Sequence, residues 1–265
     1  MAGNNITTAL LISTYNWPGA LELVLLSALQ QTKMPDEILI ADDGSGPETK
    51  TLIDNYRTRF TIPIKHAWHE DNGFRKSIVL NKAIKMSACD YIIEVDGDVI
   101  LDRRFIADHL LQAQKGFFVQ GSRAMVNEEK TNELIKNKDV AINPFSKGIY
   151  TRFNSLRIPA LTRHFDNKRM QSMKVKGCNL AFWREDYIAV NGYFNNFEGW
   201  GWEDYEFAAR LINAGIYKKR IKMVAIMYHL FHKQSSRANF LPNELIYRRT
   251  LEEKLTYCDN GYQES

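Results

Sequence analysis

Two carboxylates that lie one residue apart, at the end of an apolar run, are well suited to hold a metal ion. They are Asp96 and Asp98, on either side of Gly97, and they follow the β-branched run 91–95. Such a run is typical of a buried strand in a parallel sheet. Because residues i and i+2 of an extended segment point the same way, both carboxylates can face one point beyond the strand. Hard oxygen donors suit Mg²⁺ or Mn²⁺, which bridge phosphate oxygens. The alternative is an ordinary Asp-Gly turn.

A second pair of acids, Glu203 and Asp204, directly follows the glycine–tryptophan alternation 199–202. Acids in the first turn of a helix are favoured by the helix dipole, and this alone could explain them. Tryptophan beside carboxylates is also what a sugar site uses, because the ring stacks on the pyranose and the acids bind its hydroxyls. We favour the functional interpretation because the alternating glycines make a flexible aromatic platform.

Two histidines, His229 and His232, follow the last strand-like run of the chain. A histidine at a strand end is more often structural than functional. The spacing of these two near the predicted metal site makes either of them a candidate ligand. The sequence leaves open which one binds the metal.

The elements that must position these residues alternate between strands and helices over the first hundred residues. The apolar pattern predicts strands over 8–14, 37–41, 62–68, 91–95, 117–122, 175–183 and 223–228, and helices over 18–31, 47–60, 75–87, 103–115, 184–190, 203–214 and 242–257, with a loose tail at the end. This alternation predicts an α/β fold with a parallel sheet and right-handed crossovers.

Polar residues follow the first two strands as well as the strand that leads to Asp96. They are Thr14, Tyr15 and Asn16 after the first strand, and Asp42 and Asp43 after the second. The carboxyl ends of parallel strands meet at one edge of a sheet, where ligands bind. An acid there can bind a ribose hydroxyl, although an ordinary turn is the alternative. Neither a dinucleotide fingerprint nor a P-loop motif is present.

Length and composition place the chain among ordinary globular proteins. Its 265 residues suffice for one large α/β domain or two small ones, and a net charge of +4 gives no argument for a nucleic-acid partner. No run approaches the ~18 apolar residues of a transmembrane helix, and no signal peptide is evident. The three cysteines form neither a zinc pair nor a disulfide framework, so we expect a cytoplasmic setting.

A basic segment interrupts the regular pattern. Residues 130–176 contain eleven Lys or Arg and three acids. The segment, taken as an insert over 127–174, can be a solvated loop with small helices. It can also be a flap on the acceptor side, or a patch that faces anionic lipid or a phosphorylated saccharide.

The order of the motifs resembles that of inverting glycosyltransferases of family 2 with the GT-A fold, a Rossmann-like α/β architecture with a mostly parallel central sheet and flanking helices. The matching stretches are 11–16, 40–45, 71–75, 96–98, 177–182 and 199–207. The second half is similar to β-1,4-galactosyltransferases, chondroitin polymerases and polypeptide N-acetylgalactosaminyltransferases. The resemblance covers about residues 6–233. It implies a catalytic domain over 1–238, with a nucleotide-sugar half (1–100) and an acceptor and metal half (101–238), followed by a helical tail (239–265).

The resemblance also assigns roles to single residues. The uracil and ribose pocket would be lined by Thr14, Tyr15, Asn16 and Asp43, and the phosphates would be met by Arg75. The metal would be bound by Asp98 and His229, with His232 as the rival, and Asp96 would contact both the ribose and the metal. The base would be Asp204, and the sugar or acceptor would be held by Glu203, Trp202 and Asn179. The Q-x-x-R-W motif of processive synthases is absent, and the insert has no counterpart.

The activity that the resemblance implies is metal-dependent transfer of a hexose or N-acetylhexosamine, with galactose favoured, from a UDP-sugar to a saccharide or lipid-linked saccharide. A single displacement would invert the anomeric centre. The expected setting is assembly of a bacterial surface polysaccharide at the inner face of the membrane, with the basic insert as a peripheral contact. The alternatives are a nucleotidyltransferase acting on a sugar phosphate, and a non-catalytic sugar-binding module. The first would need a glycine-rich phosphate loop after the first strand, and the second would not need both acid pairs.

Overall fold

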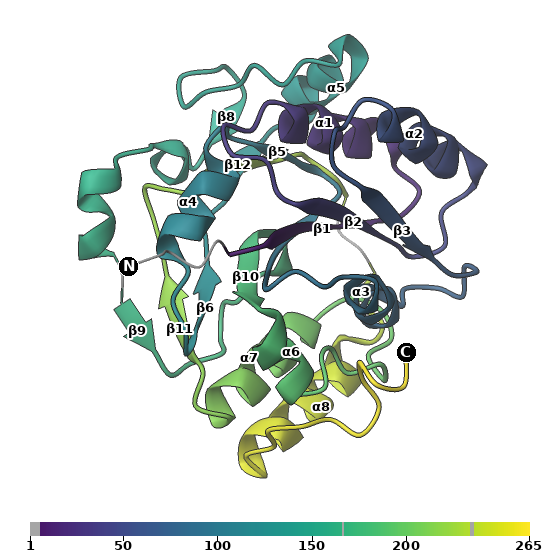
Figure 1. Ribbon diagram of the computed structural model, residues 1–265, viewed down its shortest axis with the longest axis vertical. Helices are drawn as coiled ribbons and strands as arrows, with labels where there is room; N and C mark the ends of the chain where they lie inside the picture. The colour runs from purple at the N-terminus through teal and green to yellow at the C-terminus, as the bar shows by residue number, and fades with distance from the viewer. Residues whose placement is uncertain (1–5, 166, 234–235) are drawn as a thin grey trace.

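A computed structural model describes residues 6–165, 167–233 and 236–265. Its centre is an eight-stranded sheet in the order β3-β2-β1-β4-β10-β6-β11-β9 (Figure 1). The strands are β1 (Thr8–Thr14), β2 (Glu37–Asp42), β3 (Ile64–Trp68), β4 (Tyr91–Asp96), β6 (Phe117–Gln120), β9 (Asn167–Arg169), β10 (Leu180–Trp183) and β11 (Tyr217–Arg220). Strands β3, β2, β1 and β4 are parallel, whereas β10 is antiparallel to both β4 and β6. The prediction of an α/β fold with a mostly parallel sheet is confirmed.

A second, four-stranded sheet connects the Asp-Gly-Asp turn to the histidines. It consists of β5 (Val99–Leu101), β12 (Met227–His229), β7 (Ala124–Val126) and β8 (Ile149–Tyr150), in that order. Strand β12 is antiparallel to β5, and its register pairs His229 with Val99. The Leu230 amide also donates a hydrogen bond to the Asp98 carbonyl (2.9 Å). This pairing brings two segments more than 120 residues apart to the same end of the fold.

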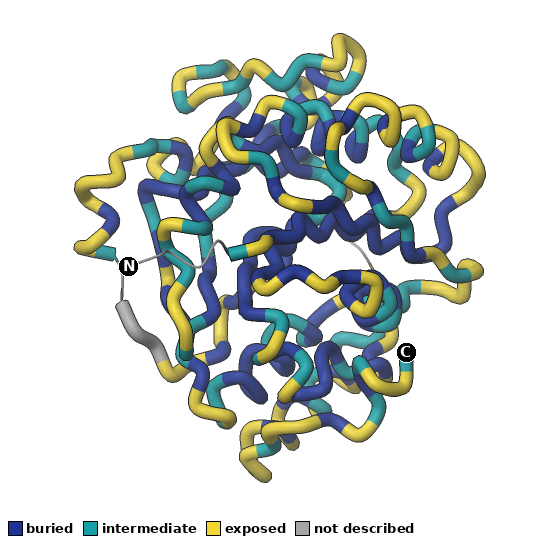
Figure 2. The backbone as a smooth tube through the Cα atoms, viewed as in Figure 1, coloured by how far each residue is buried: buried dark blue, intermediate teal, exposed yellow. Residues whose placement is uncertain are grey.

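Helices cover both faces of the central sheet. They are α1 (Pro18–Leu29), α2 (Pro47–Arg57), α3 (Lys76–Lys85), α4 (Phe105–Gln112), α5 (Glu128–Asn137), α6 (Arg184–Ala189), α7 (Glu203–Asn213) and α8 (Phe240–Glu252). Because side chains alternate along a strand, Leu10 and Ile12 pack with α1 and α2, and Leu11 packs with α3, α6 and α7 on the other face. Strands β1, β2 and β10 are buried along their whole length (Figure 2). Among the described residues, no helix combines the length and the apolar character needed to cross a bilayer.

Two predicted strands differ from the observed elements. The run 175–183 begins as a 3₁₀ turn, Gly177–Asn179, before the strand β10. In the run 223–228, Met223 and Ala225 adopt left-handed φ angles of 65° and 48°, which a strand does not allow. The Ala225 amide instead donates to Asp108 (3.0 Å). Apolar composition identified these segments, but local hydrogen bonds determine where each strand begins.

The basic insert folds into small helices, as one of the two interpretations predicts. Helix α5 is capped by the preceding residue, Asn127, whose side chain accepts a hydrogen bond from the Lys130 amide (2.8 Å). Two 3₁₀ helices follow, over Arg152–Ser155 and Pro159–His164. The Arg157 guanidinium forms two hydrogen bonds (2.9 and 2.6 Å) with the buried carboxylate of Asp108 on α4. This ion pair attaches the insert to the main domain.

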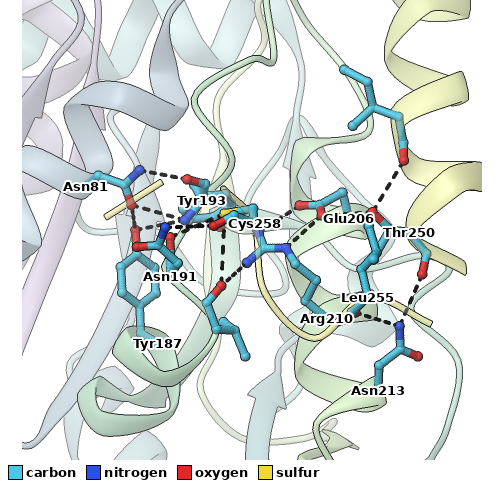
Figure 3. A network of polar contacts seen from close by, with 12 residues as sticks. Asn81, Tyr187, Asn191, Tyr193, Glu206, Arg210, Asn213, Thr250, Leu255 and Cys258 are labelled. Carbon is cyan, nitrogen blue, oxygen red and sulfur yellow. Dashed lines mark hydrogen bonds and ion pairs between the residues drawn. The ribbon is translucent and has the colours of Figure 1, made fainter. Parts of the chain in front are cut away.

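The C-terminal segment packs against the domain and does not form a loose tail. Thr250 on α8 donates to Glu206 (3.0 Å), which makes a fully buried, two-point ion pair with Arg210 on α7 (Figure 3). Further along, the Asn191 amide donates to the Cys258 carbonyl (2.8 Å). A buried ion pair must satisfy all its polar atoms to offset desolvation, and Thr250 supplies one of these bonds. Residues 240–265 are therefore part of the same folded unit as the central sheet.

Candidate active site

One large cavity, of about 1020 Å³, opens where β1, β2 and β4 end. Of the residues that the sequence singled out, its wall includes Thr14, Tyr15, Asp43, Asp96, Asp98, Trp202, Glu203, Asp204, His229 and His232. These residues come from the carboxyl ends of the strands, from the start of α7 and from the end of β12. The structure thus brings both acid pairs and the histidines into one cavity, at the sheet edge where a ligand is expected.

The first acid of the Asp-Gly-Asp turn is paired with a lysine. The Asp96 carboxylate lies 2.7 Å from the Lys76 ammonium and accepts a hydrogen bond from the Ser13 hydroxyl (3.1 Å). Burial alone would raise the pKa of Asp96, but the Lys76 charge and the hydrogen bonds from Lys76 and Ser13, with a contribution from His229, together outweigh burial and lower the pKa to about 2. Gly97 is required because a Cβ there would lie 2.6 Å from the Ser13 carbonyl oxygen. Asp96 is therefore a fixed, permanently ionised group.

The second acid, Asp98, faces the two histidines. Its carboxylate oxygens lie 3.6 Å from His229 Nε2 and 3.4 Å from His232 Nε2. Each ring places its Nδ1 against a backbone carbonyl oxygen, at 2.9 Å for His229 and 2.8 Å for His232. A carbonyl can only accept, so each Nδ1 carries a proton, and in the neutral imidazole the lone pair is then on Nε2, the nitrogen that faces Asp98.

This arrangement fits a divalent cation. Asp98 Oδ1 is buried without a hydrogen-bond partner among the described residues, and burial raises the pKa of Asp98. The three ligand atoms of Asp98, His229 and His232 all lie within 4.8 Å of one another. An ion between them would satisfy the orphaned carboxylate oxygen and both lone pairs, while the backbone carbonyls fix the orientation of the rings.

A second group of possible ligands, Asp96, Cys178 and His229, is less suitable. Cys178 is buried, burial raises the pKa of its thiol to about 12, and a soft sulfur ligand does not suit a hard cation such as Mg²⁺ or Mn²⁺. Asp96 is already occupied by Lys76 (2.7 Å). The geometry therefore favours Asp98 with both histidines over the predicted combination of Asp96, Asp98 and one histidine.

Asp204 is oriented by two hydrogen-bond donors from outside its own helix. Its Oδ2 accepts from the Gly177 amide (2.7 Å) and its Oδ1 from the Tyr193 hydroxyl (3.4 Å). Burial raises the pKa of Asp204, and the Lys76 charge and these two donors oppose the rise. Gly177 is needed because a Cβ there would lie 2.7 Å from Asp204 Oδ1. A carboxylate held in this way at a cavity wall can act as a general base.

The neighbouring acid, Glu203, is in a different environment. It is 5% exposed, and its Oε2 accepts a hydrogen bond from the Gly201 amide (2.9 Å). Burial, and then the charge of Asp204, raise the pKa of Glu203 to about 7. Among the described residues, Glu203 lacks the tyrosine donor that orients Asp204, and this difference favours Asp204 as the base and Glu203 as a group that binds a hydroxyl.

Trp202 connects the acid pair to the C-terminal helix. It precedes α7 with a left-handed φ of 77° and stacks on Tyr247 at 5.2 Å between ring centroids. Its indole Nε1 is buried without a partner among the described residues. A bulky residue in this strained conformation is uncommon and occurs where function requires it. The neighbouring Trp200 is 40% exposed and lines the same cavity.

Three predicted site residues lie outside the cavity wall. The Asn16 side chain accepts a hydrogen bond from the Gly46 amide (2.9 Å) and shapes the turn after β1. The Arg75 guanidinium forms an ion pair with Glu198 (2.6 Å), and its backbone amide donates to Asp43 (2.9 Å). In this structure the Arg75 charge is paired with Glu198, and the contact of Arg75 with phosphates stays a prediction.

The third, Asn179, is a correction to the predicted sugar contact. Asn179 is 1% exposed. Its amide nitrogen donates to the carbonyls of Ser122 (2.8 Å) and Ala225 (3.2 Å), and its oxygen lies 2.9 Å from His109 Nε2. With these bonds made inside the protein, Asn179 holds the segments around the site together and does not bind a ligand.

Sequence reasoning missed Lys76, Glu94 and Tyr193. Lys76 directly follows Arg75 and contacts Asp96, so the basic pair at the start of α3 is a signal for both residues. Glu94 is a fully buried acid inside an apolar strand, 4.0 Å from the Lys76 ammonium. A charged residue in such a run is itself an indication of function, because burial without a partner is costly.

Two family descriptions match the chain. "Glycosyl transferase family 2" matches residues 9–174, and "N-terminal domain of galactosyltransferase" matches residues 160–233. The chondroitin synthase of Pasteurella multocida (strain Pm70) is 25% identical over 229 residues, which are 80% of this chain and 24% of that protein. The validoxylamine A glucosyltransferase of Streptomyces hygroscopicus subsp. limoneus is also 25% identical, over 78% of this chain and 48% of that protein. The chain thus spans between about a quarter and about half the length of these relatives.

Solved structures share the fold. Residues 1–349 of S. aureus TarS in complex with UDP superpose with a TM-score of 0.63 at 13% identity, over 91% of this chain and 64% of that chain. The mannosyltransferase PcManGT from Pyrobaculum calidifontis, in complex with GDP-Man and Mn²⁺, superposes with a TM-score of 0.60 at 16% identity, over 88% of this chain and 59% of that chain. The fold is therefore GT-A, as the motifs predicted. Because the first family description covers more than half of the 265 residues, the chain belongs to glycosyl transferase family 2.

Proposed function

We propose that the chain is a metal-dependent, inverting glycosyltransferase that moves a hexose or N-acetylhexosamine from a UDP-sugar to a saccharide or lipid-linked saccharide acceptor. One observation carries the proposal: the Asp98, His229 and His232 cluster and the Asp204 carboxylate line the same cavity, at the ends of the parallel strands. A non-catalytic sugar-binding module would need neither a metal cluster nor a separately oriented base.

The mechanism follows from the placement of these groups. Thr14, Tyr15 and Asp43 line the part of the wall where the nucleoside would lie. Asp98 and the two histidines would hold a divalent ion, which would neutralise the charge that develops on the leaving diphosphate. On the face of the anomeric carbon opposite the diphosphate, Asp204 would take the proton from the acceptor hydroxyl as that oxygen attacks the carbon. The new glycosidic bond forms as the bond to the diphosphate breaks, so a single displacement inverts the centre.

The favoured sugar and setting rest on the relatives. Galactose is proposed because residues 160–233, which include the acid pair and His229, match the galactosyltransferase description. Mn²⁺ is favoured over Mg²⁺ because two of the three ligands are imidazoles, whereas Mg²⁺ prefers oxygen. A role in bacterial surface polysaccharide assembly is suggested by similarity to the chondroitin and hyaluronan synthases of Pasteurella multocida.

A panel of nucleotide sugars tests the donor. In a thermal-shift titration with Mn²⁺, we expect UDP-galactose or UDP-N-acetylgalactosamine to raise the melting temperature more than GDP-mannose does, since ligand binding to the native state stabilises it by mass action. The best donor is then assayed for release of UDP with saccharide acceptors. A larger shift with GDP-mannose would overturn the uridine assignment, and the absence of any turnover with any donor would overturn the proposed activity.

We also propose that the basic insert contacts an anionic membrane surface. Residues 140–165 contain no acidic side chain, and within them Phe145 and Phe153 are 82% and 52% exposed. Exposed aromatic rings among cations favour binding to anionic lipid. In sedimentation with vesicles, we expect binding to those with phosphatidylglycerol, weakened in the F145A/F153A variant. Equal binding to neutral phosphatidylcholine vesicles would contradict this proposal.

A further inference from the structure

Beneath the cavity, a buried tyrosine hydroxyl lies between two carboxylates. The Tyr193 hydroxyl is 3.0 Å from Glu94 Oε2 and 3.4 Å from Asp204 Oδ1. Tyr193 and Glu94 are completely buried, and Tyr193 is not part of the cavity wall. A hydroxyl has one proton to donate, and here it is shared between Glu94, the nearer acceptor, and Asp204. This shared hydrogen bond places the hydroxyl where it acts on the ionisation and orientation of Asp204.

The position of Tyr193 is fixed by its surroundings. Its backbone amide donates to Asn81 Oδ1 (3.0 Å), and its backbone carbonyl accepts from Asn81 Nδ2 (2.7 Å). Its ring packs on Phe207 of α7, with 4.6 Å between centroids, and also contacts Tyr187. Figure 3 shows Asn81, Tyr187 and Tyr193 in this arrangement. Because both backbone groups and the ring are held, the hydroxyl has a defined location.

The C-terminal segment supports the same loop. The Asn191 side chain donates to the Cys258 carbonyl (2.8 Å), and the Asn195 side chain donates to the Gly261 carbonyl (2.9 Å). These two asparagines are close in sequence to Tyr193, one on each side. The final residues of the chain thereby help to hold the tyrosine that reaches Asp204.

We propose that Tyr193 is a positioning residue for the reaction: its hydroxyl donates to Asp204, holds the carboxylate toward the cavity and stabilises its ionised form. The inference rests on the proposed function, in which Asp204 is the base. The groups that face Asp204 are Lys76 from α3, Glu94 and Asp96 from β4, the Gly177 amide, Tyr193 and the adjacent Glu203. Among them, the Tyr193 hydroxyl can be removed without changing the net charge or the packing of the site.

The test is the pH dependence of Y193F. A hydrogen bond to the charged form lowers the pKa of an acid, so its loss should move the acidic limb of kcat/KM to higher pH. We expect kcat at neutral pH to fall about tenfold, the lower end of the effect of a hydrogen bond to a charged group. The KM for the donor and the thermal shift with UDP should not change. Phenylalanine keeps the ring contacts with Phe207, so the variant should fold.

Two other tyrosines provide controls. Tyr91 is fully buried, and its hydroxyl has no partner among the described residues, so Y91F should leave the pH profile unchanged. The Tyr187 hydroxyl bonds to Asn81 and to the Tyr193 backbone amide but not to a carboxylate. Y187F should therefore lower the melting temperature without moving the acidic limb. A structural role alone would make Y187F and Y193F alike.

The outcomes separate this inference from the proposed function. Suppose that the wild-type protein catalyses sugar transfer and that D204N does not. If Y193F then has the same acidic limb of kcat/KM as the wild type, the role of Tyr193 is refuted and the proposed function stands. If D204N retains the wild-type rate, the assignment of the base is refuted, and the inference with it.

Discussion

Replacing Asp204 with asparagine is expected to lower kcat by about 10²–10⁴-fold, the usual contribution of a general base, while UDP binding stays intact. The reason is that asparagine keeps the size of the side chain but cannot accept the acceptor's proton. The hydrogen bond from the Gly177 amide (2.7 Å) can be retained by the new amide oxygen. The melting temperature and its shift with UDP and Mn²⁺ should therefore resemble those of the wild type.

The pH profile gives this prediction a second readout. Burial raises the pKa of Asp204 above its ordinary value near 3.8, and Asp204 must be ionised to act as the base. Activity should thus be lost as the pH falls through a value above 3.8, and kcat/KM should rise with pH until the carboxyl is fully ionised. Any residual activity of D204N should lack this acidic limb.

A matched control is available on a neighbouring helix. Asp186 lies in the first turn of α6 and is half-buried, and burial raises its pKa to about 6, but it lies outside the cavity wall. D186N should leave kcat unchanged. If D204N turned over at the wild-type rate, another group would have to be the base. If instead the wild-type protein bound UDP-sugars without any transfer, the sugar-binding module would be the better interpretation.

The strand–helix alternation could be predicted because each local apolar pattern in the first half of the chain agrees with the final fold. The runs 8–14 and 37–41 are buried on both faces, and their length and β-branched content identify them. The direction of β10 could not be predicted. It pairs with β4 and β6, each distant in sequence, and no pattern within Leu180–Trp183 distinguishes an antiparallel strand from a parallel one.

The candidate site was predictable where a residue sits directly at a strand end or a helix start. Asp98, Glu203 and Asp204 are of this kind, and the cavity contains all three. Residues whose role depends on the fold were not predictable. Tyr193 reaches Asp204 only because its loop packs across α7, and Arg75 is diverted to Glu198, which lies more than 120 residues away. Motif spacing locates the groups, and tertiary contacts determine which of them face the ligand.

Replacing Asp98 with asparagine is expected to abolish the part of the UDP thermal shift that requires Mn²⁺ and to reduce kcat strongly. Asp98 is the only carboxylate in the cluster with both histidines, so its replacement removes the negative charge that would attract and balance the cation. Loss of a residue that only hydrogen-bonds to a metal ligand can lower metal affinity by about 10–100-fold. Loss of a ligand itself should therefore weaken Mn²⁺ binding by about 100-fold or more. Calorimetric titration with Mn²⁺ measures this directly, independently of activity.

The two histidines should differ in their effects. His229 is buried and 3.6 Å from Asp98, whereas the His232 side chain is 43% exposed and 3.4 Å from it. Water can replace an exposed ligand more easily than a buried one, so H229A should weaken Mn²⁺ binding more than H232A does. H164A, which changes an exposed histidine on the insert, should have no effect. If D98N kept wild-type Mn²⁺ affinity, the metal would bind elsewhere, and the assignment of Asp98 as a ligand would be wrong.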